Sequence, residues 1–215
     1  MASAALEVVV SAAGVAADLV RAGVVTSVVA APAAVGNYRK DAMPGRLKRI
    51  LKHLWFDEAD ARRAISPAMA QRLKQRVAAS EQHHSGQIRI CVEASLPAHA
   101  LWRNAPTPHL THARAVALFG ELRVWDTEAN NGVLIYLLLA ERAIELVADR
   151  GLNQHVPAPA WQAMTRHMAE AFRERRFEDG LTQALEEVSA LLVQYFPLAP
   201  GQPRHNELPD APVVR

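Results

Sequence analysis

Two polar loops in this chain carry residue types that could do chemistry. The first, residues 125–131, lies directly before a continuous apolar run. The second, residues 149–151, follows the next apolar segment. Carboxylate and amide oxygens are the ligands that hard cations such as Ca²⁺ and Mg²⁺ require. We therefore predict a metal site built from the oxygen-bearing side chains of these loops: Asp126, Glu128, Asn130, Asn131 and Asp149.

The same residues admit a structural interpretation. Asn and Asp side chains commonly bond the backbone of a turn before a strand. Asp149 could cap a helix or pair with Arg142 or Arg150. The order Asp-x-Glu-x-Asn also lacks the full EF-hand pattern. The sequence thus leaves cation binding and turn formation both open.

Phosphate chemistry at these loops would need a nucleophile or a metal-bound water, and a cation for the developing phosphate charge. Arg142 and Arg150 could supply that cation. Glu93, at the end of another predicted strand, could be a further ligand-binding group, although an ion pair with Arg89 in the same strand is the alternative. The sequence has no Ser/His/Asp constellation, phosphate-binding loop or paired-His motif, so no catalytic residue can be named.

Hydrophobic periodicity predicts the elements that position these loops. Ser66-Pro67 starts a helix, residues 87–94 alternate as a strand, and residues 132–139 form a strand buried on both faces. The short turn after residue 139 forces an antiparallel hairpin, so the two polar loops should meet at one sheet edge. Two amphipathic helices, residues 161–172 and 181–195, close the domain. This order implies a small α/β sandwich with a mixed sheet.

Composition limits the possible function classes. The chain has 215 residues, of which 50% are hydrophobic, and 24 Lys+Arg against 22 Asp+Glu. That supports one domain of ordinary size with tails, or two small ones. A net charge of +2 gives no drive toward nucleic acid, and the single Cys91 excludes an internal disulfide and a Cys-rich zinc site.

The N-terminal region differs from the rest. Residues 1–42 are rich in Ala and Val but not apolar enough for a spanning helix, so we expect a protein that is not transmembrane. We predict that this extension is poorly ordered, or that translation starts at Met43. An export signal ending at residues 31–33 is the alternative to a cytoplasmic location.

Residues 43–64 form a predicted basic helical segment. One face is apolar, and Arg46, Lys48, Arg49 and Lys52 occupy the remainder. The basic face could contact an anionic membrane or a partner. Alternatively, the helix docks on its own domain and leaves the basic face in solvent. At the other end of the chain, residues 198–215 are predicted to be an extended, loosely attached tail.

Four stretches together resemble the TPM domain family: residues 85–93, 122–135, 147–151, and Phe196-Pro197 with residues 206–210. The match spans about residues 65 to 210 and is nearest to the short, soluble bacterial subgroup. The resemblance implies a three-layer helix–sheet–helix sandwich, with the domain proper at residues 65–197.

The resemblance also implies functions. Weak acid-phosphatase activity has been proposed for plant members, and some members bind divalent cations. Soluble members often appear beside a membrane-anchored TPM-domain protein and a LemA-type protein. We therefore expect a non-catalytic cytoplasmic interaction domain that works with a membrane-associated partner. The alternative is a weak metal-dependent phosphatase that uses the loops around Asp126 and Asp149.

Overall fold

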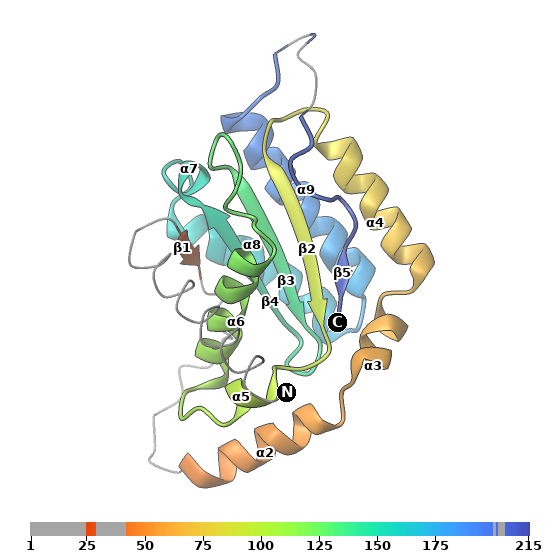
Figure 1. The fold of residues 1–215 in the computed structure, drawn as a ribbon, viewed down its shortest axis with the longest axis vertical. Coiled ribbons are helices and arrows are strands. Elements are labelled where there is room, and N and C mark those ends of the chain that lie inside the picture. Colours follow the sequence, from red (N-terminus) through yellow and green to blue (C-terminus); the bar gives the residue numbers. More distant parts are fainter. Residues whose placement is uncertain (1–24, 29–41, 200, 202–204) are drawn as a thin grey trace, which may run out of the picture.

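A five-stranded mixed sheet forms the centre of the molecule in the computed structural model, which describes residues 25–28, 42–199, 201 and 205–215 (Figure 1). The strands run in the order β1-β4-β3-β2-β5. β3 and β4 form the predicted antiparallel hairpin, β2 runs parallel to β3 and β5, and β1 runs antiparallel to β4. Their bounds are β1 Val25–Val28, β2 Gln87–Glu93, β3 Gly132–Leu138, β4 Ala143–Asp149 and β5 Val213–Val214.

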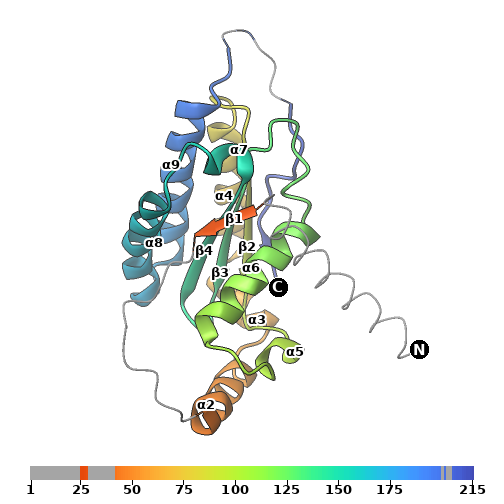
Figure 2. The same ribbon diagram turned by 90° about the vertical axis from the view of Figure 1, so that its left-hand side faces the viewer.

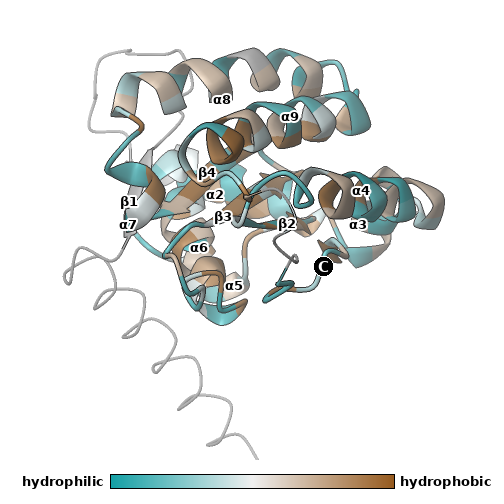
Figure 3. Ribbon diagram, turned by 90° about the horizontal axis from the view of Figure 1, so that it is seen from above, coloured by the Kyte–Doolittle hydropathy of each residue, from teal (hydrophilic) through white to brown (hydrophobic). Residues whose placement is uncertain are grey.

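Helices cover both faces of the sheet (Figures 2 and 3). On one face lie α4, α8 and α9, and on the other lie α5 and α6. This arrangement confirms the predicted three-layer helix–sheet–helix sandwich. The helix bounds are α2 Ala42–Leu54, α3 Glu58–Ala64, α4 Pro67–Ser80, α5 Ala98–Leu101, α6 Thr107–Glu121, α7 Arg150–Asn153, α8 Ala158–Arg173 and α9 Phe177–Tyr195.

The central strand β3 contributes to both hydrophobic cores. Alternate side chains, beginning at Val133, pack under α4, α8 and α9, while the others, beginning at Leu134, pack under α6. All seven residues of β3 are buried, as predicted for a strand covered on both faces. Ser66 Oγ accepts a hydrogen bond from the Met69 N–H at 3.3 Å, and Pro67 follows it, so the predicted start of α4 is also confirmed.

The C-terminal residues are extended, but the prediction that they are loosely attached is wrong. Val213 and Val214 pair with β2, and Leu208 is buried. Gln87 Oε1 accepts hydrogen bonds from the N–H groups of Glu207 at 3.0 Å and Leu208 at 3.1 Å. Without this segment, β2 would be an edge strand with unpaired backbone groups, which explains why the chain returns to cover it.

Within residues 1–42, the structure describes β1, which pairs with β4, and Ala42, the first residue of α2. The rest of the predicted N-terminal extension lies outside the described residues, so its predicted disorder and the start at Met43 stay predictions. Among the described helices, none has the length and apolar character needed to cross a bilayer.

Helix α2 does form over the predicted basic segment, and it docks on its own domain as one of the two predictions stated, but part of its basic face is turned toward the domain and not into solvent. Arg49 and His53 are buried against the domain, and the side chains of Arg46 and Lys52 are hydrogen-bonded to it. Arg49 and His53 of the basic side are therefore buried, whereas Lys48 and Lys52 remain exposed. Backbone carbonyls and a carboxylate of the domain lie beneath α2, and they bind cations better than they bind leucine side chains.

Candidate functional site

The two polar loops of the sequence meet at one edge of the sheet, as the hairpin predicted. Val133 near the start of β3 is opposite Ala148 near the end of β4. The Gly151 N–H then donates a hydrogen bond to the Asn130 carbonyl oxygen at 2.9 Å. The antiparallel register therefore brings residues 126–131 and 149–151 into direct backbone contact.

Gly151 permits this close contact. A Cβ atom at Gly151 would lie 2.5 Å from the Asn130 oxygen and 2.8 Å from the Ala129 oxygen, too close for any side chain. Asn130 itself has a left-handed backbone conformation, with φ of 51°. Two backbone carbonyl oxygens consequently lie against the turn that carries Asp149.

Asp149 is fully buried at this edge, and its hydrogen bonding is incomplete. Its Oδ1 caps α7 by accepting the Arg150 N–H at 2.6 Å, whereas its Oδ2 has no hydrogen-bond partner among the described residues. The capping role that the sequence left open is therefore real, but it uses one of the two oxygens. A buried oxygen without a donor lowers the stability of the folded protein by about 1–3 kcal/mol, and a bound ligand would remove this cost.

Burial raises the pKa of Asp149 from 3.8 to about 6, against the lowering effects of the backbone hydrogen bond and charge of Arg150. The carboxyl group therefore takes up a proton more readily than an ordinary aspartate. A divalent cation would compete with that proton, because metal ligands must be deprotonated.

Asn131 has a second unpartnered oxygen at the same edge. The residue is fully buried, its N–H donates to Thr127 Oγ1 at 3.1 Å, and its Nδ2 donates to Ser85 Oγ at 3.2 Å. Its Oδ1 has no hydrogen-bond partner in the part of the chain that the structure describes. The structure thus leaves one acceptor unsatisfied on each of the two loops.

The other two predicted metal ligands lie on the surface of the first loop. Asp126 forms an ion pair with Arg123, and its side chain is about half exposed. Glu128 is exposed, and its N–H donates to Glu207 Oε2 at 2.9 Å. Within the described residues, no group of three or more His, Cys, Asp and Glu side chains could hold a metal ion. A cation at this edge would therefore need amide or backbone oxygens beside Asp149.

Arg142 and Arg150 were both predicted as possible cations for phosphate at the two loops, and the structure places Arg142 at the opposite end of β4 from them. Arg142 precedes β4 and Arg150 follows it, so the length of the strand, on the order of 25 Å, separates them. Arg142 instead lines a separate cavity of about 540 Å³ near the start of β4. Of these two arginines, Arg150 is the one that lies beside the two polar loops.

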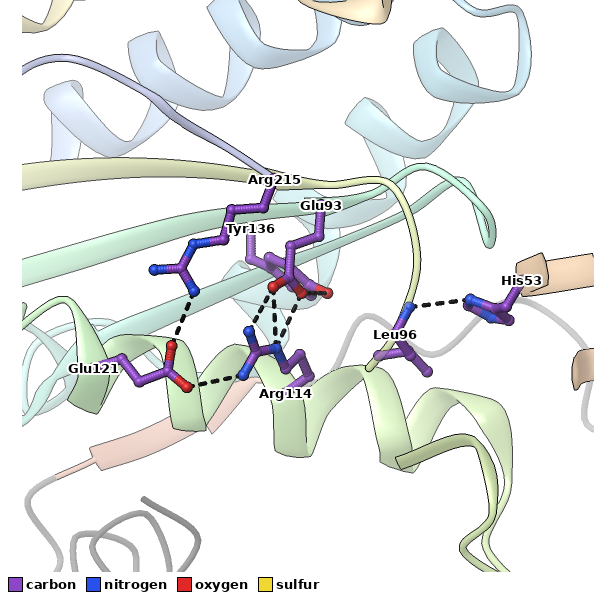
Figure 4. Close-up of polar contacts among 7 residues, drawn as sticks. All are labelled: His53, Glu93, Leu96, Arg114, Glu121, Tyr136 and Arg215. Atoms are coloured by element: carbon purple, nitrogen blue, oxygen red, sulfur yellow. Dashed lines mark hydrogen bonds and ion pairs between the residues drawn. The ribbon is translucent and has the colours of Figure 1, made fainter. Parts of the chain in front are cut away.

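Glu93 is buried, and the prediction that it pairs with Arg89 is wrong (Figure 4). Arg114 of α6 donates to both carboxylate oxygens, at 2.5 to 3.2 Å, and the Tyr136 hydroxyl donates to Oε2 at 2.9 Å. Four residues along a strand span about 13 Å, too far for the Arg89 side chain to bridge, whereas α6 packs directly over Glu93. Arg89 donates to the Pro209 and Ala211 carbonyl oxygens instead.

Several contributors to these sites were missed from the sequence. Arg114 lies in a helix otherwise rich in Ala and Leu, and a lone arginine on such a helix is the signal that could have suggested a buried carboxylate partner. Arg114 also binds Glu121, which in turn binds Arg215 (Figure 4). Ser85 and Glu207 come from segments far apart in the sequence, and no local pattern indicates their contacts.

Comparisons with known proteins settle the family. A family model described as the TPM domain matches residues 59–191. The chain belongs to the TPM domain family. This TPM domain is also similar to a solved structure, the NMR structure of BA42 protein from the psychrophilic bacterium Bizionia argentinensis, with a TM-score of 0.58 and 23% identity. That alignment covers 69% of this chain and 93% of BA42, and it supports the fold alone. No curated protein matches the chain.

Proposed function

We propose that this TPM domain is a non-catalytic module that binds a divalent cation, Ca²⁺ or Mg²⁺, where residues 126–131 meet residues 149–151. The observation that carries the proposal is the buried Asp149 Oδ2 without a donor. The unpartnered Asn131 Oδ1 and the carbonyl oxygens of Ala129 and Asn130 supply further oxygen atoms at this edge. A hard cation prefers this donor set to nitrogen or sulfur.

Cation binding should raise the melting temperature of the protein. At ten times the dissociation constant, one bound ion adds about 1.4 kcal/mol, which corresponds to about 3 to 6 °C for a chain of this size. Differential scanning fluorimetry with millimolar CaCl₂ or MgCl₂ at pH 7.5 measures this shift. The shift should disappear in Asp149→Asn and fall only partly in Asp126→Asn, since Asp126 already pairs with Arg123.

Glu145→Gln is the matched control, because Glu145 is another buried carboxylate of β4 and has a pKa raised by burial. This variant should keep the full cation-induced shift. A wild-type protein that does not respond to either ion, or an Asp149→Asn variant that responds normally, would contradict the proposal.

We also propose that the domain works with a membrane-associated partner in the cytoplasm, namely a membrane-anchored TPM-domain or LemA-type protein. Family membership supports this proposal. Crosslinking in membranes followed by mass spectrometry tests it. The expected result is enrichment of such a protein in the presence of Ca²⁺ or Mg²⁺, and its absence from wild-type crosslinks would contradict the proposal.

A weak phosphatase remains the second candidate, favoured by Arg150 directly after Asp149. Two observations weigh against it. Burial raises the pKa of Cys91 to about 12, so its thiol is not a nucleophile at neutral pH, and Glu93 is already bound by Arg114 and Tyr136. Hydrolysis of p-nitrophenyl phosphate with and without Mg²⁺ tests it. Activity that persists in Asp149→Asn would indicate a contaminant.

A further inference from the structure

Helix α2 is held on the domain by its polar side chains. The Arg49 guanidinium, 8% exposed, donates to the carbonyl oxygens of Leu101, Arg103 and Ala105 at 2.8 to 2.9 Å. These carbonyls lie at and after the C-terminal end of α5, where helix carbonyls lack intrahelical partners. Removing Arg49 from this position would leave those acceptors without a charged donor.

A second set of contacts fixes the other end of α2. The His53 ring is buried, and its Nδ1 accepts the Leu96 N–H at 3.1 Å (Figure 4). Its Nε2 lies 2.9 Å from Glu141 Oε1. Lys52 Nζ lies 2.6 Å from Glu141 Oε2. Burial alone would raise the pKa of Glu141, but the hydrogen bonds from His53 and Lys52 outweigh it and lower the pKa. The helix is therefore fixed in one rotational setting.

This setting turns the apolar side of α2 outward. Leu47 is 61%, Leu51 51%, Leu54 73% and the following Trp55 83% exposed. Trp102, 63% exposed, lies next to the same helix, because the Arg46 guanidinium lies 5.3 Å from its ring centroid. We call these five side chains the α2 apolar face. They are five of the seven exposed large hydrophobic residues in the described part of the chain.

The position of α2 makes this face accessible. The helix lies at one end of the molecule, away from the layers that cover the sheet (Figures 1 and 2). Exposed hydrophobic residues that occur singly need no explanation, but a contiguous patch with a polar rim marks an interaction surface.

Charge and residue type indicate what the α2 apolar face contacts. Helix α2 contains no acidic side chain, and Lys48 and Lys52, two of its four cationic side chains, are exposed. The first acidic residues, Asp57 and Glu58, come after the helix, where Asp57 caps α3. Leucine and tryptophan bordered by lysine and arginine are typical of helices that lie in the headgroup region of anionic membranes. Protein interfaces, in contrast, are depleted in lysine.

We propose that the α2 apolar face docks the domain directly on an anionic phospholipid bilayer. The helix already has its bound conformation, so docking would not require it to fold. The proposal does not depend on the cation site, which lies on the opposite end of β4 from the Glu141 contact with α2.

Vesicle flotation of the full chain tests this proposal. Vesicles of phosphatidylcholine with 30% phosphatidylglycerol should carry the protein, and pure phosphatidylcholine vesicles should carry much less. The double variant Leu51→Ala/Trp55→Ala should lose at least about tenfold in binding, because each side chain contributes apolar area to the bilayer. Lys48→Ala should lose about fivefold on anionic vesicles only. Both altered positions of the double variant are more than half exposed, so its melting temperature should stay unchanged.

The matched control is Trp125→Ala/Val193→Ala, which removes exposed apolar side chains elsewhere and should bind like the wild type. All measurements are made in EDTA, and Asp149→Asn should bind normally, so that failure of this proposal and failure of the cation site are distinguishable. Equal binding by Leu51→Ala/Trp55→Ala, or no binding to anionic vesicles, would overturn the proposal. A lipid-free dimer that this variant converts to a monomer would overturn it in favour of a second copy of the chain.

Discussion

Glu93 and Asp149 are both buried carboxylates at the last residue of a strand, yet their surroundings differ. Glu93 ends β2, where Arg114 donates to both of its oxygens and Tyr136 donates to Oε2. Asp149 ends β4, which runs antiparallel to β2, so it lies at the opposite edge of the sheet. Within the described part of the chain, its Oδ1 accepts the Arg150 N–H and its Oδ2 has no donor.

This difference distinguishes a carboxylate that stabilises the fold from one that is able to bind a ligand. A buried carboxylate whose oxygens are all bound stabilises the native arrangement and has little capacity left for a ligand. A buried carboxylate with an unpartnered oxygen destabilises the fold until something binds it. Glu93, predicted as a ligand-binding residue, belongs to the first kind, and Asp149 belongs to the second.

The largest expected effect is the loss of stability when the ion pair between Arg114 and Glu93 is removed. Arg114→Ala should lower the free energy of unfolding by about 3 to 5 kcal/mol, because it leaves a buried carboxylate without its counter-ion. Urea unfolding followed by circular dichroism measures this. Arg76→Ala is the control, since Arg76 and Glu186 form an exposed pair worth less than about 1 kcal/mol. Equal losses in the two variants would show that Glu93 does not need its partner.

Asp149→Asn should stabilise the cation-free protein at pH 7.5, by no more than about 2 kcal/mol. The folded-state pKa of Asp149, about 6, lies above its ordinary value of 3.8. The wild type therefore loses stability as the pH rises from about 4 to 6, because the unfolded state ionises first. Asp149→Asn should lack this loss. Unfolding titrations in EDTA at several pH values measure the stability of both proteins. If stability depended on pH in the same way in both, the inference that the Asp149 carboxylate is unsatisfied would be contradicted.

Tyr136→Phe should have the smallest effect, a loss of about 1 kcal/mol, because Arg114 still binds both oxygens of Glu93. The same urea unfolding measurement applies. A loss as large as that of Arg114→Ala would mean that the hydroxyl, and not the guanidinium, secures Glu93.

Much of the fold could be predicted from local sequence. The alternation of β2, the continuous apolar run of β3 and the short turn before β4 predicted the core hairpin, and Ser66-Pro67 predicted the start of α4. The contact between the two polar loops followed from the hairpin alone. Neither β1 nor β5 was predicted, because short edge strands gain their stability from the strand beside them and carry little pattern of their own.

The candidate site was predicted only in part. The residue types of the loops gave Asp149 and Asn131, but not the fact that each has an unpartnered oxygen. The partners of Glu93 and the separation of Arg142 from Arg150 depend on which elements pack together, and sequence distance does not report that.

By itself, the sequence determined the secondary structure and the residue types at each loop, because period, capping and turn chemistry act over a few residues. The tertiary structure alone decided which buried charge is satisfied and which face of α2 is exposed. A helix with cations on one side and leucines on the other can be packed either way. The Leu101 carbonyl group at the end of α5 and the Glu141 carboxylate, both distant in sequence, determined that Arg49 and the Lys52 head group face the domain.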